Sequence, residues 1–198
     1  MSKFEQRLVS ETLTVEERAK GDSNAPVLVG YAAVFNKMSV VIGGSYGFRE
    51  MIEPGAFDDV LEDDVRAVLN HDANFVLGRA GAGTLRLSVD DVGLRYEVDL
   101  PDTSYAKDLL ESVRRGDIKE SSFKFTVLTD DWSENDEGTV RSIKKIGRLL
   151  DVSPVTYPAY PDATVAQRSL EEWKKANSYK QETGKRLQLY RTELESKL

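Results

Sequence analysis

The chain has 198 residues, a formal net charge of −7, a single histidine and no cysteine. Its length is enough for one domain with an appendage, and the lack of cysteine excludes disulfides, thiol nucleophiles and cysteine-based zinc sites. The acidic balance argues against nucleic-acid binding, which needs a basic patch to displace phosphate counterions. No apolar run is long enough for a membrane span or a signal segment, so we expect a protein of the reducing cytosol with no membrane partner.

The first hundred residues have the pattern of a mainly β protein. The last three of the predicted strands follow one another over short connections, which predicts an antiparallel meander. Residues 36–50 are rich in glycine and predict a long loop, which in a compact domain is usually functional or mobile. Strands are predicted from an apolar run at 27–35, from short segments at 65–72 and 75–79, and from alternating apolar and polar residues at 84–89 and 94–100.

A short helix is predicted after Glu53-Pro54-Gly55, with Phe57 and Val60 on its apolar side. Such an acid-rich helix is either a solvated face or the divalent metal site of a hydrolase. The spacing of the acids matches no metal-binding loop, which favours the solvated face. The acids in question are Asp58, Asp59, Glu62, Asp63 and Asp64.

The second half begins with a helix and continues with strands. Thr103 or Ser104 is placed to cap a helix that ends at Gly116. A strand follows at once, and an acidic hairpin loop at 130–138 leads to another strand at 140–146. A last strand begins at residue 149, before three prolines remove backbone donors and end it.

The composition changes at residue 168 to Glu, Lys, Gln, Leu and Ala, with no proline. Residues 168–198 contain eight Lys or Arg and five Glu, which is a net charge of +3. This segment is either a solvated helical tail or one that docks on an acidic partner. We therefore expect a domain over residues 1–167 followed by a partly detached, basic helical tail over residues 168–198.

The strand after Gly116 carries two adjacent serines, and we interpret Ser122 as a nucleophile. With a period of 2, Phe123 and Phe125 share one face and Ser122 lies on the other. Burying the aromatic face would aim Ser122 away from the core, while Ser121 would point with the phenylalanines. A Ser-Ser-Phe strand is more often an ordinary strand, and a serine hydroxyl is a weak nucleophile that needs a base.

The only histidine, His71, is the one imidazole available as that base. A third group, a carboxylate, would have to fix its tautomer and stabilise the imidazolium. Asp151 is the candidate, because an acid within the apolar stretch 149–152 needs a partner there. Two ordinary alternatives are open: Asp151 pairs with an arginine or a backbone amide, and His71 is a core or surface residue. The chain order His71, Ser122, Asp151 matches none of the familiar hydrolase orders.

Eight short blocks follow one another between about residue 11 and residue 168: Gly30–Asn36, Glu53–Phe57, Leu69–Asp72, Leu77–Arg79, Gly83–Leu87, Asp99–Thr103, Ser122–Phe125 and Asp151–Tyr160. In this order they resemble the prohead (capsid maturation) protease family of tailed bacteriophages. By position, the histidine of that family falls on His71 and its serine on Ser122. The acidic position is often Glu in relatives and is Asp151 here.

The family is similar to the herpesvirus assemblins, which are serine endopeptidases with a closed, mostly antiparallel β-barrel. Assemblins use a second histidine as the third catalytic residue, and this chain has none to offer. The resemblance implies a mainly β fold with flanking helices (α+β), an assemblin-like closed barrel and the C-terminal helical tail. It leaves the third role with Asp151.

The resemblance further implies a serine endopeptidase that cleaves the capsid precursor, or its scaffolding segment, inside the immature head in the host bacterial cytoplasm. Self-cleavage would follow, and no cofactor is expected. The capsid precursor would be the partner, and a homo-oligomer is a further expectation. Arg79 and Arg148 are candidates for stabilising the oxyanion. The alternative function is a catalytically silent scaffold or assembly chaperone with the same fold.

Overall fold

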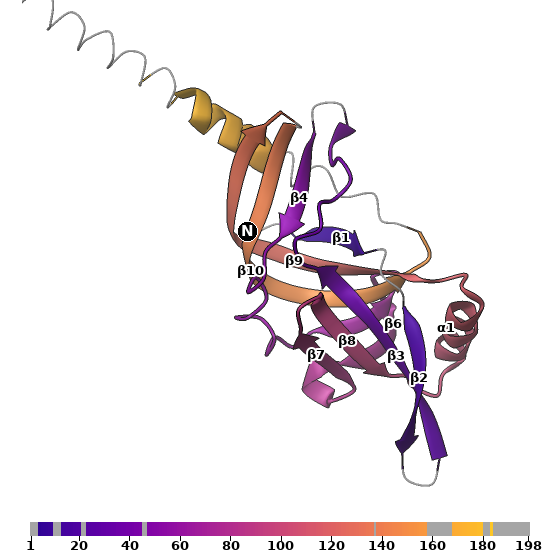
Figure 1. Cartoon of the computed structure of the whole chain (residues 1–198). Helices are drawn as coiled ribbons and strands as arrows, with labels where there is room; N and C mark the ends of the chain where they lie inside the picture. Colours follow the sequence, from indigo (N-terminus) through magenta and orange to yellow (C-terminus); the bar gives the residue numbers. More distant parts are fainter. Residues whose placement is uncertain are drawn as a thin grey trace, which may run out of the picture.

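The computed structural model describes residues 4–9, 13–20, 23–44, 47–136, 138–157, 168–179 and 183. These residues form two β-sheets that face each other, with one helix beside the sheets and another at the far end of the longest strands (Figure 1). The described part of the chain is therefore mainly β with two α-helices, in agreement with the predicted α+β class.

The first sheet has six strands in the order β1-β9-β10-β5-β6, with β4 also paired to β10. The pairs β10–β4 and β10–β5 are parallel and the others are antiparallel. Its longest strands, β9 and β10, form a curved pair that extends beyond the second sheet in Figure 1. The six strands are β1 (Glu5–Val9), β4 (Phe48–Ile52), β5 (Arg66–Leu69), β6 (Asp72–Arg79), β9 (Glu120–Asn135) and β10 (Gly138–Val155).

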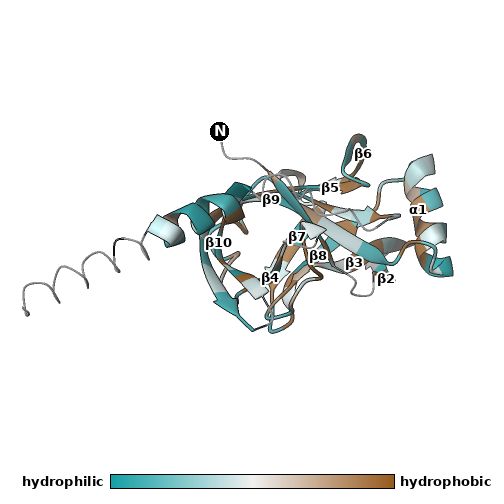
Figure 2. Cartoon of the chain, turned by 90° about the horizontal axis from the view of Figure 1, so that it is seen from above, coloured by the Kyte–Doolittle hydropathy of each residue, from teal (hydrophilic) through white to brown (hydrophobic). Residues whose placement is uncertain are grey.

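The second sheet has four antiparallel strands in the order β2-β3-β8-β7. Its inner face packs on the first sheet, and the apolar residues gather between the two layers (Figure 2). Leu28, Tyr96 and Phe123 have no exposed surface in this core. The four strands are β2 (Thr14–Lys20), β3 (Ser23–Val34), β7 (Leu85–Val89) and β8 (Gly93–Asp99).

Helix α1 (Ser104–Arg115) is amphipathic, and its residues Leu109 and Val113 are buried against the core. Thr103 is its N-cap, as predicted, but its side chain makes no capping hydrogen bond. Gly116 ends the helix in the left-handed conformation, with φ of 79°, which glycine adopts at little cost. A short 3-10 helix, η2 (Ala80–Ala82), follows β6. In the part of the chain that the structure describes, no helix is long and apolar enough to cross a membrane.

The second α-helix covers residues 168–179 and packs on the outer part of β9 and β10. Leu170 is buried with Phe48, and the ring of Trp173 stacks on Trp132 at 6.1 Å. The start of the predicted tail is therefore not detached. The later part of the predicted tail helix, beyond residue 179 and apart from residue 183, lies outside the described residues.

Two expectations about the fold are wrong, and a third, the closed barrel, is not confirmed. Residues 54–62 form successive turns instead of a helix, with hydrogen bonds such as Val60 N–H to Phe57 C=O, although both side chains are buried as predicted. The predicted meander is broken, because β6 joins the first sheet while β7 and β8 form a hairpin in the second. Instead of one closed barrel, the described strands form two separate sheets.

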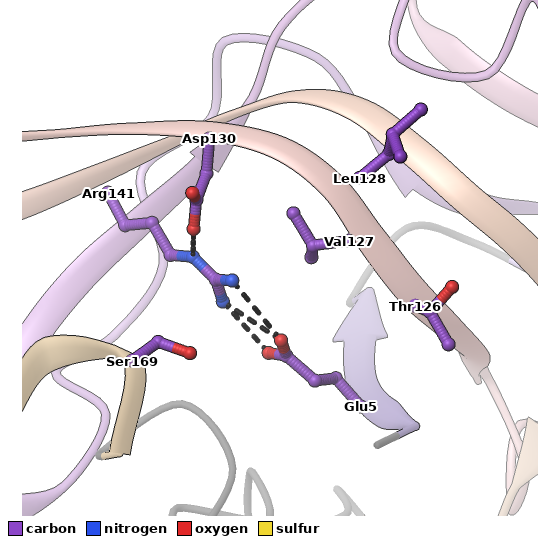
Figure 3. A pocket seen from close by; sticks show the side chains of 7 residues that line it. All are labelled: Glu5, Thr126, Val127, Leu128, Asp130, Arg141 and Ser169. Atoms are coloured by element: carbon purple, nitrogen blue, oxygen red, sulfur yellow. Dashed lines mark hydrogen bonds and ion pairs between the residues drawn. The ribbon is translucent and has the colours of Figure 1, made fainter. Parts of the chain in front are cut away.

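A buried cluster of charges anchors β1 beside β9. Arg7 donates to Glu50 at 2.6 Å and to Glu5 at 2.5 Å. Arg141 donates to both Glu5 and Glu50 at 2.9 Å. Its Nε also donates to Asp130 at 2.6 Å, beside a cavity of about 220 Å³ (Figure 3). Because buried charges are tolerated only when paired, this cluster holds the first strand in one position at the edge of the sheet.

Candidate active site

Strand β9 carries the two serines with their side chains on opposite faces. The hydroxyl of Ser121 lies 2.8 Å from that of Tyr96, in the core between the sheets and on the same side as Phe123. Ser122 points to the other side, as the alternation predicts. It is not exposed there, since the residue has no accessible surface. His71 lies over the hydroxyl on that face.

A β-bulge in β10 brings Asp151 to the same face as Ser122. In the pairing of β10 with β9, Leu149 lies opposite Phe125 and Asp151 lies opposite Lys124, so two steps on β10 match one step on β9. Without this bulge, regular pairing would place Asp151 opposite Phe123, and the alternation would turn it toward the phenylalanine side. The bulge therefore aims the carboxylate out of the core and toward the histidine.

His71 comes from the turn between β5 and β6. Leu69 pairs with Asp72, so Asn70 and His71 are the two residues of the hairpin loop. Both have positive φ, 53° and 58°, as a type I′ turn requires. Since β5 runs beside β10, this turn lies over the face that presents Ser122 and Asp151. The predicted strand at 65–72 thus ends two residues before the histidine.

The imidazole of His71 bridges the two other residues. Its Nε2 lies 2.7 Å from Ser122 Oγ, and its Nδ1 lies 2.5 Å from Asp151 Oδ1. The shorter side chain of aspartate, compared with glutamate, is long enough here. With the proton on Nδ1 shared with the carboxylate, Nε2 is free to accept the serine proton. This arrangement has the geometry needed for proton transfer from a serine hydroxyl.

The site is shielded from water but adjoins a cavity. The side chains of His71 and Asp151 are only 9% and 11% exposed. Burial at this level strengthens the interaction between the imidazole and the carboxylate relative to the same pair in water. A cavity of about 370 Å³ opens beside the imidazole, lined by Gln6, Asn70, His71, Val155, Thr156 and Tyr157. The histidine is therefore the residue of the three that borders this cavity.

The two arginines considered for the oxyanion are not at the site. Arg79 lies at the far end of β6 and forms a bidentate pair with Asp64, at 2.6 to 3.1 Å. Arg148 lies opposite Thr126, four positions along β9 from Ser122, which is roughly 13 Å. Neither assignment is supported by this geometry.

The acids at 58–64, for which a metal site was the less favoured alternative, are also separated. Asp59 pairs with Lys145 at 2.7 Å, Asp64 pairs with Arg79, and Asp63 accepts a hydrogen bond from the backbone of Leu149. Among the residues that the structure describes, no group of three or more acids or histidines is arranged to hold a metal ion. The acid cluster serves as a set of ion pairs and backbone contacts.

Sequence reasoning assigned no role to Ser153, which contacts the histidine turn, or to Asn70, which is part of that turn. The Ser153 hydroxyl accepts a hydrogen bond from the backbone N–H of His71 at 3.1 Å. The side chain of Asn70 accepts a hydrogen bond from the backbone N–H of Thr156 at 2.8 Å. Asn before His at the end of a predicted strand is itself a signal for a turn with positive φ. No comparable signal marks Ser153.

Comparisons with known proteins were made on the whole chain. A sequence model of the family described as caudovirus prohead serine protease matches residues 11–176, a range that contains His71, Ser122 and Asp151. Among solved structures, the chain is similar to the bacteriophage T4 capsid assembly protease, gp21, with 13% identity and a TM-score of 0.47. That similarity covers 77% of this chain and 99% of the other. No curated protein matches the chain.

Proposed function

This chain belongs to the caudovirus prohead serine protease family, and we propose that it is a serine endopeptidase with Ser122 as nucleophile. His71 acts as general base and Asp151 orients and stabilises the imidazole. The observation that carries the proposal is the pair of contacts of one imidazole, 2.7 Å to the serine hydroxyl and 2.5 Å to the carboxylate. Hydrolysis by a catalytic serine requires the nucleophile, a base in contact with it, and a group that orients the base.

The proposed reaction proceeds in two halves. In the first, His71 Nε2 takes the Ser122 proton as the serine oxygen bonds to the scissile carbonyl carbon. The imidazolium then gives that proton to the leaving amine, the peptide C–N bond breaks, and an acyl-serine is left. In the second half, water loses a proton to His71 and attacks the ester, and the proton returns to the serine oxygen as the acyl group leaves. Asp151 stays ionised throughout and accepts the hydrogen bond from Nδ1–H.

The proposed substrate is the capsid precursor or its scaffolding segment, cleaved inside the immature head in the infected cell. Family membership supports this, because the family is defined as prohead proteases. We also propose that the enzyme cleaves itself late in maturation, and that the basic segment 168–198 is a tail that is trimmed from the domain over residues 1–167.

Co-expression with the cognate capsid precursor tests the proposed function. The parent chain should convert the precursor to its mature length, as measured by intact mass spectrometry, and the Ser122→Ala variant should not. If Ser122→Ala processed the precursor as the parent chain does, the assignment of Ser122 as nucleophile would be wrong. A catalytically silent scaffold predicts a different result: heads assemble equally well with either chain, and the precursor stays uncut in both.

A further inference from the structure

The backbone of His71 is held in a conformation that a histidine does not adopt by default. Its φ of 58° lies in the left-handed region, next to Asn70 at 53°. For residues other than glycine this region is unfavourable, and it persists where surrounding contacts impose it. Asn70 is a usual residue of such turns, and the backbone of His71 beside it is held by a side-chain contact.

The side chain that supports His71 is Ser153. Its Oγ accepts the backbone N–H of His71 at 3.1 Å, and the same oxygen lies 3.3 Å from Nδ1 of the imidazole. Ser153 has no exposed surface, and it lies directly opposite Ser122 in the pairing of β10 with β9. One hydroxyl therefore contacts both the backbone and the ring of the histidine, from the strand that also carries Asp151.

The position of Ser153 follows from the same strand geometry as that of Asp151. The two residues are two apart on β10, so both project to the face that carries Ser122. Asp151 Oδ1 lies 2.5 Å from Nδ1, where it can accept the Nδ1–H hydrogen bond, and Ser153 Oγ is a second, longer contact of the same nitrogen. The ring is thus fixed on its Nδ1 side by two side chains, which leaves Nε2 directed at the serine.

We propose that Ser153 is a positioning residue for His71, an inference that rests on the proposed function. Its hydroxyl holds the left-handed turn and the Nδ1 edge of the ring, so that Nε2 stays within hydrogen-bond distance of Ser122. Ser153 itself touches neither the substrate nor the scissile bond. Loss of this hydroxyl leaves a buried backbone N–H without its acceptor and lets the ring turn away from the nucleophile.

The test compares Ser153→Ala with Ser153→Thr, which keeps the hydroxyl, in cleavage of the capsid precursor. Ser153→Ala should lower kcat roughly 10- to 100-fold with KM unchanged, the size expected from a misplaced catalytic group. Ser153→Thr should recover part of that loss. A wild-type kcat in Ser153→Ala would overturn the proposal.

A second readout needs no activity. Because His71 is the only histidine, its two ring nitrogens give unambiguous ¹⁵N resonances that report which nitrogen carries the proton. The parent chain and Ser153→Thr should show the same pair of ¹⁵N shifts, and in Ser153→Ala the Nε2 shift should move because the hydrogen bond between Nε2 and Ser122 is weakened. An unchanged pattern in Ser153→Ala would overturn the proposal even if the chain proved not to be a protease. The control is Ser121→Ala, another fully buried serine, which contacts Tyr96 and should leave the resonances unchanged.

Discussion

His71 Nε2 and Ser122 Oγ lie 2.7 Å apart, although 51 positions separate the two residues in the chain. The contact exists because a hairpin turn at one strand end folds over the face of a different strand. Ser122 lies on β9, an inner strand of the first sheet, and His71 lies in the turn that joins β5 to β6 of the same sheet. The distance between the two side chains is therefore set by the pairing of the strands. Because the backbone holds the contact rigidly, the effect of a single substitution can be attributed to the side chain that it changes.

Replacing Asp151 with Asn should disable turnover without unfolding the protein. The amide keeps the shape of the carboxylate but loses its charge, so it no longer stabilises the imidazolium or selects the Nδ1-protonated form. In a serine triad this type of change costs on the order of 10⁴-fold in kcat. Cleavage rates and urea unfolding should be measured together. A variant that unfolds, or one that keeps its rate, would make Asp151 a structural partner only.

Replacing Ser121 with Ala should lower stability and leave cleavage intact. Burial raises the pKa of the Tyr96 phenol, so its hydroxyl stays protonated and needs a partner inside the core. Without the serine oxygen, a buried O–H is left unsatisfied at a cost of about 1 to 3 kcal/mol.

The double variant Ser121→Ala with Tyr96→Phe removes both partners and should recover much of that loss in urea unfolding. If Ser121→Ala abolishes cleavage while the fold remains, the nucleophile has been assigned to the wrong serine.

Replacing Arg141 with Met should be strongly destabilising. The side chain is 2% exposed and pairs with Glu5 and Glu50, which would be left buried with too little positive charge. Breaking a buried ion pair on one side costs roughly 3 to 5 kcal/mol. The matched control is Arg114→Met, whose pair with Glu17 is about half exposed on both sides and should contribute about 1 kcal/mol or less. Equal unfolding midpoints for the two variants would contradict the importance of the buried cluster.

The stability of the second sheet should depend on pH through Glu97. A hydrogen bond from Arg18 is the largest cause that lowers the pKa of this carboxyl to about 2, with Arg95 and Arg86 adding to it. The folded pKa lies below the unfolded value of about 4.3, so the unfolded state binds the proton first as the pH falls. The stabilisation is complete above that unfolded value and is lost as the pH falls toward 2.

Glu97→Gln should therefore have a lower urea midpoint than the parent at pH 7, with a difference that shrinks steadily between pH 5 and pH 3. A difference that stays constant over this range would show that the charge of Glu97 is not what stabilises the sheet.

The strands were predictable because their pattern is local. Alternation of apolar and polar residues identified β7 and β8, and the apolar run at 27–35 identified most of β3. Pairing is not local, so the sequence did not reveal that β6 belongs to the other sheet. The segment after Gly55 has the apolar spacing of a helix and packs as predicted, but its backbone hydrogen bonds are those of turns.

The same difference between local patterns and long-range pairing applies to the site. His71 and Ser122 could be nominated because one histidine limits the choice of base and the alternation gives each serine a face. Asp151 reaches the histidine because of a bulge at Leu150, and no residue type in that stretch indicates a bulge. The buried pairing of Arg7 with Glu50 was likewise invisible, since the two residues lie 43 positions apart.

The measurement that tests the central claim most directly is labelling by diisopropyl fluorophosphate of the chain co-expressed with its capsid precursor. This small phosphorylating reagent reacts with a serine whose hydroxyl a neighbouring base has activated. The account predicts one adduct, located on Ser122 by peptide mass spectrometry, retained in Ser121→Ala and lost in His71→Ala. An adduct on any other serine, or none on the parent chain, would contradict it.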